Sequence, residues 1–435
     1  MPSKYLHMQA HMSHPTAIKT LKGLFDSALS KAYPTKALAS YLPPTPRGRT
    51  VVVGAGKASA AMGQALDDVL TQISDSLVLV PYGHERTCRS VNIVEASHPV
   101  PDTAGQKGAQ KILDLASSLG ADDLLICLLS GGGSALLSLP PKGVTLTEKK
   151  DITRRLLACG ASIHQINTVR KHLSAIKGGR LAAAAFPART LTLAISDVPG
   201  DDPATIASGP TVGDPTTGDE ALGILESFGI RTPASIASAL ASPDAESPFP
   251  GDATLAHSEF RIAATAADAL EAAVAYARQN GFKAINLGDQ VEGIASVLAR
   301  DHAKIFEQEL REQPDNKGLA LLSGGEATVV LHGAGKGGPN QEYLLALAIV
   351  LDGRPDVFAI AADTDGIDGA SKAAGAVITP DTLARAAGLA MDPREYLARN
   401  DAGSFFEQLD DLIVTGPTCT NVNDFRAIAY IPEPG

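Results

Sequence analysis

The clearest structural signal in the chain is the sequence Leu124-Leu125-Ile126-Cys127-Leu128-Leu129, which runs directly into Ser130-Gly131-Gly132-Gly133-Ser134. A short, uninterrupted apolar run is typical of a strand that is buried on both faces of a parallel sheet. The glycines that follow allow the backbone to touch a ligand and to present its N–H groups to it. Since ligands of open α/β sheets bind beyond the carboxyl ends of the strands, this turn is a candidate binding site.

The same order of strand, polar turn and helix repeats on both sides of this segment. Upstream, residues 50–53 predict a buried strand, and residues 58–69 carry apolar side chains at helical spacing. Downstream, the pattern predicts a helix over residues 163–177 and a strand over residues 191–195. This alternation is typical of a doubly wound α/β sheet.

A change in composition divides the chain. Residues 232–259 are rich in Pro, Ser, Ala and Asp and have no strong period, so they are interpreted as a linker. Beyond them the alternation resumes, with strands predicted at residues 319–322 and 357–361, among others. We therefore predict an N-terminal Rossmann-like α/β/α sandwich over residues 1–240 and a smaller C-terminal α/β domain over residues 260–435.

Composition excludes several classes of protein. The 435 residues carry a net charge of −11, which disfavours a nucleic acid as the main ligand, and only 4% of them are aromatic. No apolar run approaches the length of a membrane span. The four cysteines form no CxxC pair, which favours reduced thiols in a cytoplasmic protein. We expect small-molecule partners, no membrane or nucleic acid, and a monomer or homodimer.

Turns rich in Gly, Ser, Thr and Asp follow six predicted strands. Candidate ligand contacts in these turns are Gly54, Gly56, Lys57, Ser130 to Ser134, Asp197, Ser323, Gly324, Gly325, Glu326, Asp363, Asp365, Thr415, Gly416, Thr418, Asn421 and Asp424. Any one of them could be an ordinary turn. Six together favour a shared binding function.

The first of these turns, residues 54–59, superficially resembles two nucleotide-binding motifs. The dinucleotide fingerprint fails because Ser59 replaces its third glycine and no clear acid ends the next strand. The Walker motif fails because Ala58 replaces its hydroxyl residue. What remains is Lys57 at a helix N-terminus, where its ammonium and backbone donors suit a carboxylate or phosphate. The alternative is that Lys57 is only the first solvent-facing residue of the helix.

Two cations and two acidic turns complete the set. Arg170 and Lys177 fall seven residues apart in the predicted helix and would form a cationic stripe suited to phosphate oxygens, or else a solvated basic face. Asp197 and the pair Asp363 and Asp365 lie in acidic turns, where clustered carboxylates favour a divalent cation. Mg²⁺ fits better than Ca²⁺, because the bidentate Glu of a calcium loop is absent. There is no GxSxG motif, so a serine hydrolase is unsupported.

Taken together, these motifs resemble the glycerate 2-kinase family, whose members have an N-terminal glycerate-kinase domain and a C-terminal MOFRL domain. The matching segments are residues 53–59, 129–136, 166–181, 195–215, 337–342, 363–369 and 415–424. The resemblance implies that ATP, with a divalent cation such as Mg²⁺, phosphorylates D-glycerate to 2-phosphoglycerate in a cleft between two α/β domains. Some relatives are labelled hydroxypyruvate reductases, so an NAD(P)H-dependent reductase is the alternative.

The resemblance also suggests roles. Lys57 would bind the glycerate carboxylate or the transferred phosphoryl group, and Asp197 would orient or deprotonate the substrate hydroxyl. The Ser130–Ser134 turn, Arg170 and Lys177 would hold phosphate oxygens. Mg²⁺ would lie near Asp197 or near Asp363 and Asp365. The turns at residues 323–326 and 415–424, together with Asn340 and Glu342, would contribute from the second domain.

The chain departs from the common family text at two positions. Pro339 stands where many relatives have Arg, so Arg170, Lys177 or Lys336 would have to supply that charge. Cys419 stands where Gly is usual, which would narrow its loop.

Overall fold

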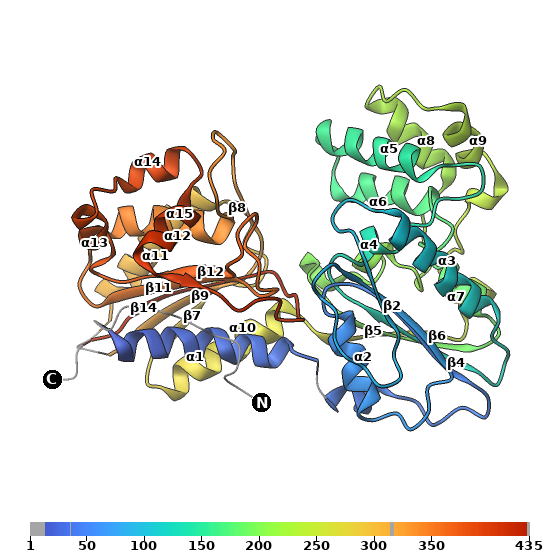
Figure 1. Ribbon diagram of the computed structural model, residues 1–435, viewed down its shortest axis with the longest axis horizontal. Coiled ribbons are helices and arrows are strands. Elements are labelled where there is room, and N and C mark those ends of the chain that lie inside the picture. Colours follow the sequence, from blue (N-terminus) through green and yellow to red (C-terminus); the bar gives the residue numbers. More distant parts are fainter. Residues whose placement is uncertain (1–13, 35, 314–316, 433–435) are drawn as a thin grey trace. The chain divides into compact units, whose positions relative to one another are not determined.

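The chain folds as two compact units, drawn in Figure 1. The computed structural model describes residues 14–34, 36–313 and 317–432. Of the described residues, those within Pro34–Ala263 form one unit, and those up to Tyr33 together with those from Ala264 onward form the other. Within the described residues, no helix combines the length and apolar character needed to cross a bilayer.

The first unit contains a six-stranded sheet with the order β3-β2-β1-β4-β5-β6. The strands are β1 (Thr50–Ala55), β2 (Asp75–Pro81), β3 (Ile93–Ala96), β4 (Leu124–Leu129), β5 (Arg189–Ile195) and β6 (Ser258–Ala264). The pairs from β3 to β5 are parallel. All six residues of β4 are buried, as its apolar sequence predicts. The expected doubly wound α/β fold is confirmed.

Helices cover both faces of this sheet in Figure 1, α2 on one face and α3 and α7 on the other. The helices of this unit are α2 (Ser59–Asp67), α3 (Thr103–Ser117), α4 (Gly133–Leu136), α5 (Leu146–Ala158), α6 (Ile163–His172), α7 (Arg180–Ala185), α8 (Gly218–Ser227) and α9 (Ala234–Leu240). Helices α5, α6, α8 and α9 share a separate apolar cluster that includes Ile152, Val169 and Leu225. The unit therefore joins a sheet core to a small helical layer.

The helix predicted over residues 163–177 is confirmed to residue 172 and is wrong over its last five residues. Helix α6 ends at His172, and residues 173–179 form a turn before α7. The Ser174 hydroxyl accepts hydrogen bonds from the amides of Ile176 and Lys177, and Gly178 and Gly179 have φ angles of 58° and 82°. These features favour a turn over a continued helix. Arg170 and Lys177 therefore do not share one helix face.

A capping box begins α6. The Ser162 side chain accepts from the Gln165 amide, and the Gln165 side chain accepts from the Ser162 amide. We expect Ser162→Ala to lower the free energy of unfolding by about 1 kcal/mol, because the Gln165 amide loses its partner. Urea denaturation measures the change, with Ser117→Ala, at the exposed last residue of α3, as the control. An equal loss in both variants would contradict the role of the cap.

The second unit contains a mixed sheet with the order β13-β12-β11-β14-β9-β7. The strands are β7 (Lys283–Asn286), β9 (Leu319–Ser323), β11 (Val357–Asp363), β12 (Gly375–Ile378), β13 (Leu412–Ile413) and β14 (Asp424–Tyr430), with the short pair β8 (Gly293–Ile294) and β10 (Ala327–Thr328) outside the sheet. Strand β14 lies antiparallel between β11 and β9. Among the described residues of this sheet, β7 and β9 form the parallel pair, and β8 and β10 also pair in parallel outside it.

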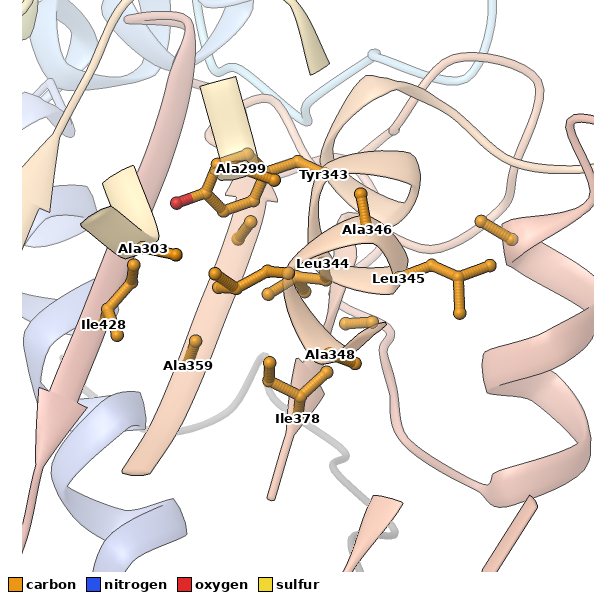
Figure 2. Close-up of a cluster of buried hydrophobic side chains, with 14 of the residues drawn as sticks. Ala299, Ala303, Tyr343, Leu344, Leu345, Ala346, Ala348, Ala359, Ile378 and Ile428 are labelled. Atoms are coloured by element: carbon orange, nitrogen blue, oxygen red, sulfur yellow. The ribbon is translucent and has the colours of Figure 1, made fainter. Parts of the chain in front are cut away.

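One helix forms the centre of this unit. The helices are α1 (Pro15–Ala32), α10 (Ala266–Gln279), α11 (Ala295–Arg311), α12 (Pro339–Leu351), α13 (Thr382–Gly388), α14 (Pro393–Ala398) and α15 (Ala402–Leu409). Residues 340–348 of α12 are all buried. Figure 2 shows Leu344 of α12 close to Ala359 of β11 and Ile378 of β12. A helix that is apolar on all sides needs such complete cover.

Two boundaries differ from those predicted. Helix α1 was assigned to the N-terminal domain, but it packs on the second unit, where Phe25 contacts Phe425 with ring centroids 5.7 Å apart. Residues 232–259 are not a loose linker: they contain α9 and the start of β6, a strand of the first sheet. Both errors have the same cause, because these segments are ordered by partners that are distant in sequence.

Candidate active site

A pocket of about 770 Å³ opens in the first unit beside the turn that follows β4. Its lining residues are His98, Pro99, Val100, Pro101, Gly132, Ser134, Ala135, Ser138, Thr147, Lys149, Lys150, Asp151, Thr153, Arg154, Leu157, Arg170 and Lys177. Four of them, Gly132, Ser134, Arg170 and Lys177, are residues that the sequence singled out. The pocket size suits a small-molecule ligand.

The sheet register brings three predicted turns to one edge. Ala55 of β1 pairs with Leu129 of β4, and Leu129 pairs with Ala194 of β5. Because these strands are parallel, the chain leaves all three of them at the same edge. Lys57, the Ser130–Ser134 turn and Asp197 each follow one of these strand ends. The structure thus groups these candidates at one edge of the sheet, although Lys57 and Asp197 do not line the pocket itself.

The glycines of the first turn are required by the neighbouring strand. A Cβ atom on Gly56 would lie 2.1 Å from Ser130 Oγ, and one on Gly54 would lie 2.4 Å from the Leu128 carbonyl oxygen. Gly56 also has a φ of 143°. Packing against β4 and its exit accounts for both residues, so they provide no evidence for a bound dinucleotide.

The backbone donors expected beside Lys57 are already used. The Lys57 amide donates to the Gly131 carbonyl at 2.9 Å, and the Ala58 amide donates to Ser130 Oγ at 2.9 Å. The expectation that these amides and the Lys57 ammonium converge on one anion is therefore wrong. The side chain of Lys57 is half-buried.

The glycine turn itself is closely packed on one side and open to the pocket on the other. Gly132 has a φ of 81°, and a Cβ atom on Gly133 would lie 2.7 Å from the Ala55 carbonyl oxygen. Ser134 Oγ lies 2.8 Å from Ser208 Oγ. Within the described ranges, the amides of Gly131 and Gly132 donate to no protein acceptor. Such donors at a strand exit suit oxygen atoms of an anion.

Among the cations that line the pocket, Lys149, Arg170 and Lys177 repel one another, and sequence reasoning found only two of these three. Lys149 is 5% exposed and donates to the Leu173 carbonyl oxygen at 2.6 Å. Lys177 is 1% exposed and donates to the Ser134 carbonyl oxygen at 2.8 Å. Sequence reasoning missed Lys149. This residue lies in the buried stripe of α5 with Ile152 and Leu156, and a lysine within an apolar stripe is the signal that could have revealed it.

The electrostatics of this cluster are unusual. Burial, followed by repulsion from Arg170 and Arg180, lowers the pKa of Lys149 to about 7. Burial, together with the charges of Lys149 and Arg170, also lowers the pKa of Lys177 well below its ordinary value. In the described part of the chain, none of Lys149, Arg170 and Lys177 forms a salt bridge with an acid. Among the described residues, these three side chains therefore have no carboxylate partner at the pocket.

A strained segment contacts the glycine turn through Ser208, whose Oγ lies 2.8 Å from Ser134 Oγ. Ala207, Ser208 and Gly209 have successive φ angles of 51°, 60° and 56°. Their backbone is held in place because the Gly178 amide donates to the Ser208 carbonyl and the Gly179 amide donates to that of Gly209. Strained backbone that is held by its surroundings is frequent at functional sites. The sequence Ser208-Gly209-Pro210 was recognised only as part of the family resemblance.

A buried ionic network anchors the end of α6, and sequence reasoning did not find it. Asp214 is fully buried and accepts from Lys171 Nζ at 2.6 Å and from Thr216 Oγ1 at 2.7 Å. His172 Nδ1 lies 2.7 Å from the Ala245 carbonyl oxygen. These bonds tie the C-terminal turn of α6 to residues 214–247 and so help to position Arg170.

In the second unit, several predicted residues also meet at one sheet edge. Asp363 pairs with Asp424, and Ser323 pairs with Arg426. Asp424 accepts from Asn340 Nδ2 at 2.6 Å and from Arg426 Nη2 at 2.6 Å. Both Asn340 and Asp424 are buried. Their observed contacts are internal and hold the N-terminus of α12 against β14.

Asp368 joins the same network. It accepts from the amides of Asn340 and Gln341 at 3.0 and 2.9 Å. Burial raises the pKa of Asp368 to about 7, and the charge of Asp424 adds to this rise. The carboxyl group thus stabilises the first turn of α12 through its backbone donors.

The acidic turn after β11 is organised by its own backbone. Asp363 Oδ1 accepts from the Asp365 amide, and Asp365 Oδ1 accepts from the Ile367 amide. Across the described residues, no group of three or more His, Cys, Asp or Glu side chains could hold a metal ion. Mg²⁺ usually takes one or two carboxylates and completes its shell with phosphate oxygens and water, so Asp197, Asp363 and Asp365 stay predicted ligands.

The other predicted residues of the second unit have mixed surroundings. Glu342 lines a separate pocket of about 420 Å³ and accepts from Asn400 Nδ2 at 3.0 Å.

The turn that follows β13 is held by hydrogen bonds to the backbone. Thr418 Oγ1 donates to the Thr364 carbonyl oxygen, and Thr415 Oγ1 donates to the Gly416 carbonyl oxygen. Asn421 is buried, and a Cβ atom on Gly325 would lie 2.4 Å from the Val291 backbone. The Gly324 carbonyl oxygen accepts from Arg426 Nη1, and Glu326 is exposed.

The two departures from the family text have local explanations. Pro339 is the first residue of α12, a position where its fixed φ and missing N–H cost little. Cys419 has a φ of 61°, which glycine adopts at lower cost. Lys336 donates its amide to Asp401 Oδ1 in the second unit.

Comparison with known proteins assigns both parts of the chain. The "Domain of unknown function (DUF4147)" model matches residues 20–241, and the MOFRL family model matches residues 319–424. The "D-glycerate 2-kinase" of Thermotoga maritima is 37% identical over 95% of this chain and 98% of its own length. A protein of Agrobacterium vitis named "Putative hydroxypyruvate reductase" is 48% identical over 95% of this chain and 94% of its own.

A solved structure agrees with the sequence comparison. The crystal structure of glycerate kinase from Thermotoga maritima matches with a TM-score of 0.86 and 37% identity, and the match covers 96% of this chain and 100% of that one. The pairing of domains, the full-length similarity and the fold lead to one conclusion. The chain is an enzyme of the glycerate kinase family.

Proposed function

We propose that the protein transfers the γ-phosphoryl group of ATP to the 2-hydroxyl of D-glycerate, giving 2-phosphoglycerate and ADP. The observation that carries the proposal is the pocket beside the glycine turn, where Arg170 and Lys177 have no acidic partner among the described residues. Phosphoryl transfer requires little covalent chemistry from a protein. It requires alignment of the hydroxyl, neutralisation of the phosphate charge and exclusion of water.

The residues of the first unit can be given roles in this reaction. The Gly131 and Gly132 amides and the Arg170 guanidinium would hold phosphate oxygens. Lys57 would bind the glycerate carboxylate or the transferred group, and Asp197 would orient the 2-hydroxyl or accept its proton. Mg²⁺, held by Asp197 or by Asp363 and Asp365, would neutralise phosphate charge when bound.

The proposal is tested by incubating the protein with ATP, Mg²⁺ and D-glycerate. We expect ADP to form only when glycerate is present, and phosphorus NMR to show the phosphate on the 2-hydroxyl. Removing the divalent cation with EDTA should abolish turnover, and added Mg²⁺ should restore it. A product phosphorylated at the 3-hydroxyl would contradict the regiochemistry, and no glycerate-dependent ADP would contradict the kinase activity.

An NAD(P)H-dependent hydroxypyruvate reductase is the second candidate, because the protein of Agrobacterium vitis carries that name. The packing at Gly54 and Gly56 weighs against it, since the neighbouring strand accounts for both glycines. No acidic residue lies within residues 79–84, at the end of β2, to bind a ribose. Oxidation of NADH by the purified protein with hydroxypyruvate would reverse this choice.

A further inference from the structure

Two buried lysines line one pocket, and the roles given above leave one of them, Lys149, without an explanation. Lysine is almost never fully buried unless it is paired with an acid. Lys149 and Lys177 are 5% and 1% exposed, yet each ammonium donates only to a main-chain carbonyl, of Leu173 and Ser134 respectively, among the described residues. A carbonyl oxygen accepts a hydrogen bond but carries no full charge.

The surroundings increase the positive charge rather than offset it. Arg170 lines the same pocket, without a hydrogen bond or ion pair in the described residues, and Arg180 of α7 adds repulsion toward Lys149. Lys150 and Arg154 also line the pocket, as does His98 from the segment between β3 and α3. The one acid in the lining, Asp151, forms ion pairs with Arg154 and Arg155. An anionic ligand would therefore meet no unpaired carboxylate in this lining.

We propose that Lys149, Arg170 and Lys177 form a subsite for the dianionic phosphoryl group of a ligand, and that Lys149 binds a proton when this group enters. The cluster should bind a dianion more tightly than a monoanion such as a simple carboxylate. Every cation of the cluster attracts every negative charge of the ligand, so a second ligand charge strengthens binding. This inference rests on the proposed function only for the identity of the natural ligand. In it, Lys149 is a residue that favours dianionic over monoanionic ligands.

The proton uptake follows from the state of the empty cluster. Near pH 8, a lysine with a pKa of about 7 is mostly neutral. A dianion beside it favours the charged ammonium and raises its pKa, so binding draws a proton from solvent. Below pH 6 the lysine is already charged in the empty pocket, and uptake should disappear.

Sulfate is a suitable probe, because it stays a dianion from pH 6 to 9 and any proton taken up must bind to the protein. Calorimetric titrations at constant ionic strength, in two buffers with different ionisation enthalpies, give the number of protons bound. We expect roughly 0.5–1 proton per sulfate at pH 8, almost none at pH 6, and affinity that falls several-fold from pH 7 to 9. Acetate should bind at least about tenfold more weakly than sulfate.

Two variants assign the effect. Lys149→Met should remove at least half of the uptake at pH 8, whereas Lys150→Met, which deletes a neighbouring charge in the same lining, should leave uptake unchanged. Wild-type binding without proton uptake would overturn the inference, and so would equal uptake in Lys149→Met. If Lys149→Met does not fold, the pH dependence of sulfate binding by the wild-type protein still decides the matter.

Competition distinguishes the source of the phosphoryl group. Either 2-phosphoglycerate or a non-hydrolysable ATP analogue should displace sulfate, and the one that does so identifies the ligand that occupies the subsite. Displacement by neither would overturn the inference. The sulfate titrations need neither substrate, so a protein that fails as a glycerate kinase could still take up the proton, and an active kinase could fail to do so.

Discussion

Replacing Lys57 by methionine is expected to lower kcat for glycerate phosphorylation by at least about 100-fold, equivalent to about 2.7 kcal/mol of transition-state stabilisation. The amides of Lys57 and Ala58 donate to Gly131 and Ser130, so the ammonium is the part of this turn that can contribute charge to the reaction. Methionine keeps the length of the side chain and does not affect those backbone bonds. The loss should therefore appear in turnover without a loss of stability.

Steady-state kinetics and thermal unfolding are measured on the same preparation of this variant. Lys142→Met, an exposed site in the same unit, serves as the control and should keep normal kcat. A Lys57→Met enzyme with near-normal kcat would remove Lys57 from the site. A lowered melting temperature of this variant would instead show that the loss of turnover comes from impaired folding.

Replacing Asp214 by asparagine is expected to lower the free energy of unfolding by about 3–5 kcal/mol, because it leaves the buried charge of Lys171 without its partner. Asparagine preserves the shape of the side chain but not the charge. The double variant Asp214→Asn/Lys171→Met removes both charges and should recover part of the loss.

The same pair predicts a dependence on pH. Burial acts to raise the pKa of Asp214, but hydrogen bonds from Lys171 and Thr216 and the charge of Lys171 outweigh it and hold the pKa below its ordinary value. The unfolded chain then binds more protons than the folded one in acid. The stabilisation is therefore present above the ordinary Asp pKa of about 4 and is lost as the pH falls through the lower folded value.

Urea denaturation at pH 7 and at pH 3 tests both statements. The difference between wild type and Asp214→Asn should be largest at pH 7 and smaller at pH 3. Asp122→Asn, at an exposed position, should change stability by less than about 0.5 kcal/mol. A loss below about 1 kcal/mol for Asp214→Asn at pH 7 would contradict the role of the buried pair.

The candidate site was partly predictable because some of its features are local. The glycine turn after β4 is encoded by adjacent residues, and its place at a strand exit follows from the apolar run before it. The prediction that Arg170 and Lys177 line up on one helix is wrong, because that helix ends at His172. They reach one pocket because the Ser174 turn and the 208–210 segment fold the chain back toward Ser134.

The sequence alone determined the α/β class, the strand exits that carry polar turns and the family, because these depend on short-range periodicity and on motifs read along the chain. The tertiary structure decided that α1 packs on the second unit, that β14 runs antiparallel between β9 and β11, and that Lys149 meets Lys177 without an acid. These features depend on side chains far apart in sequence. Burial and charge at such contacts arise only when the chain has closed the loops between them.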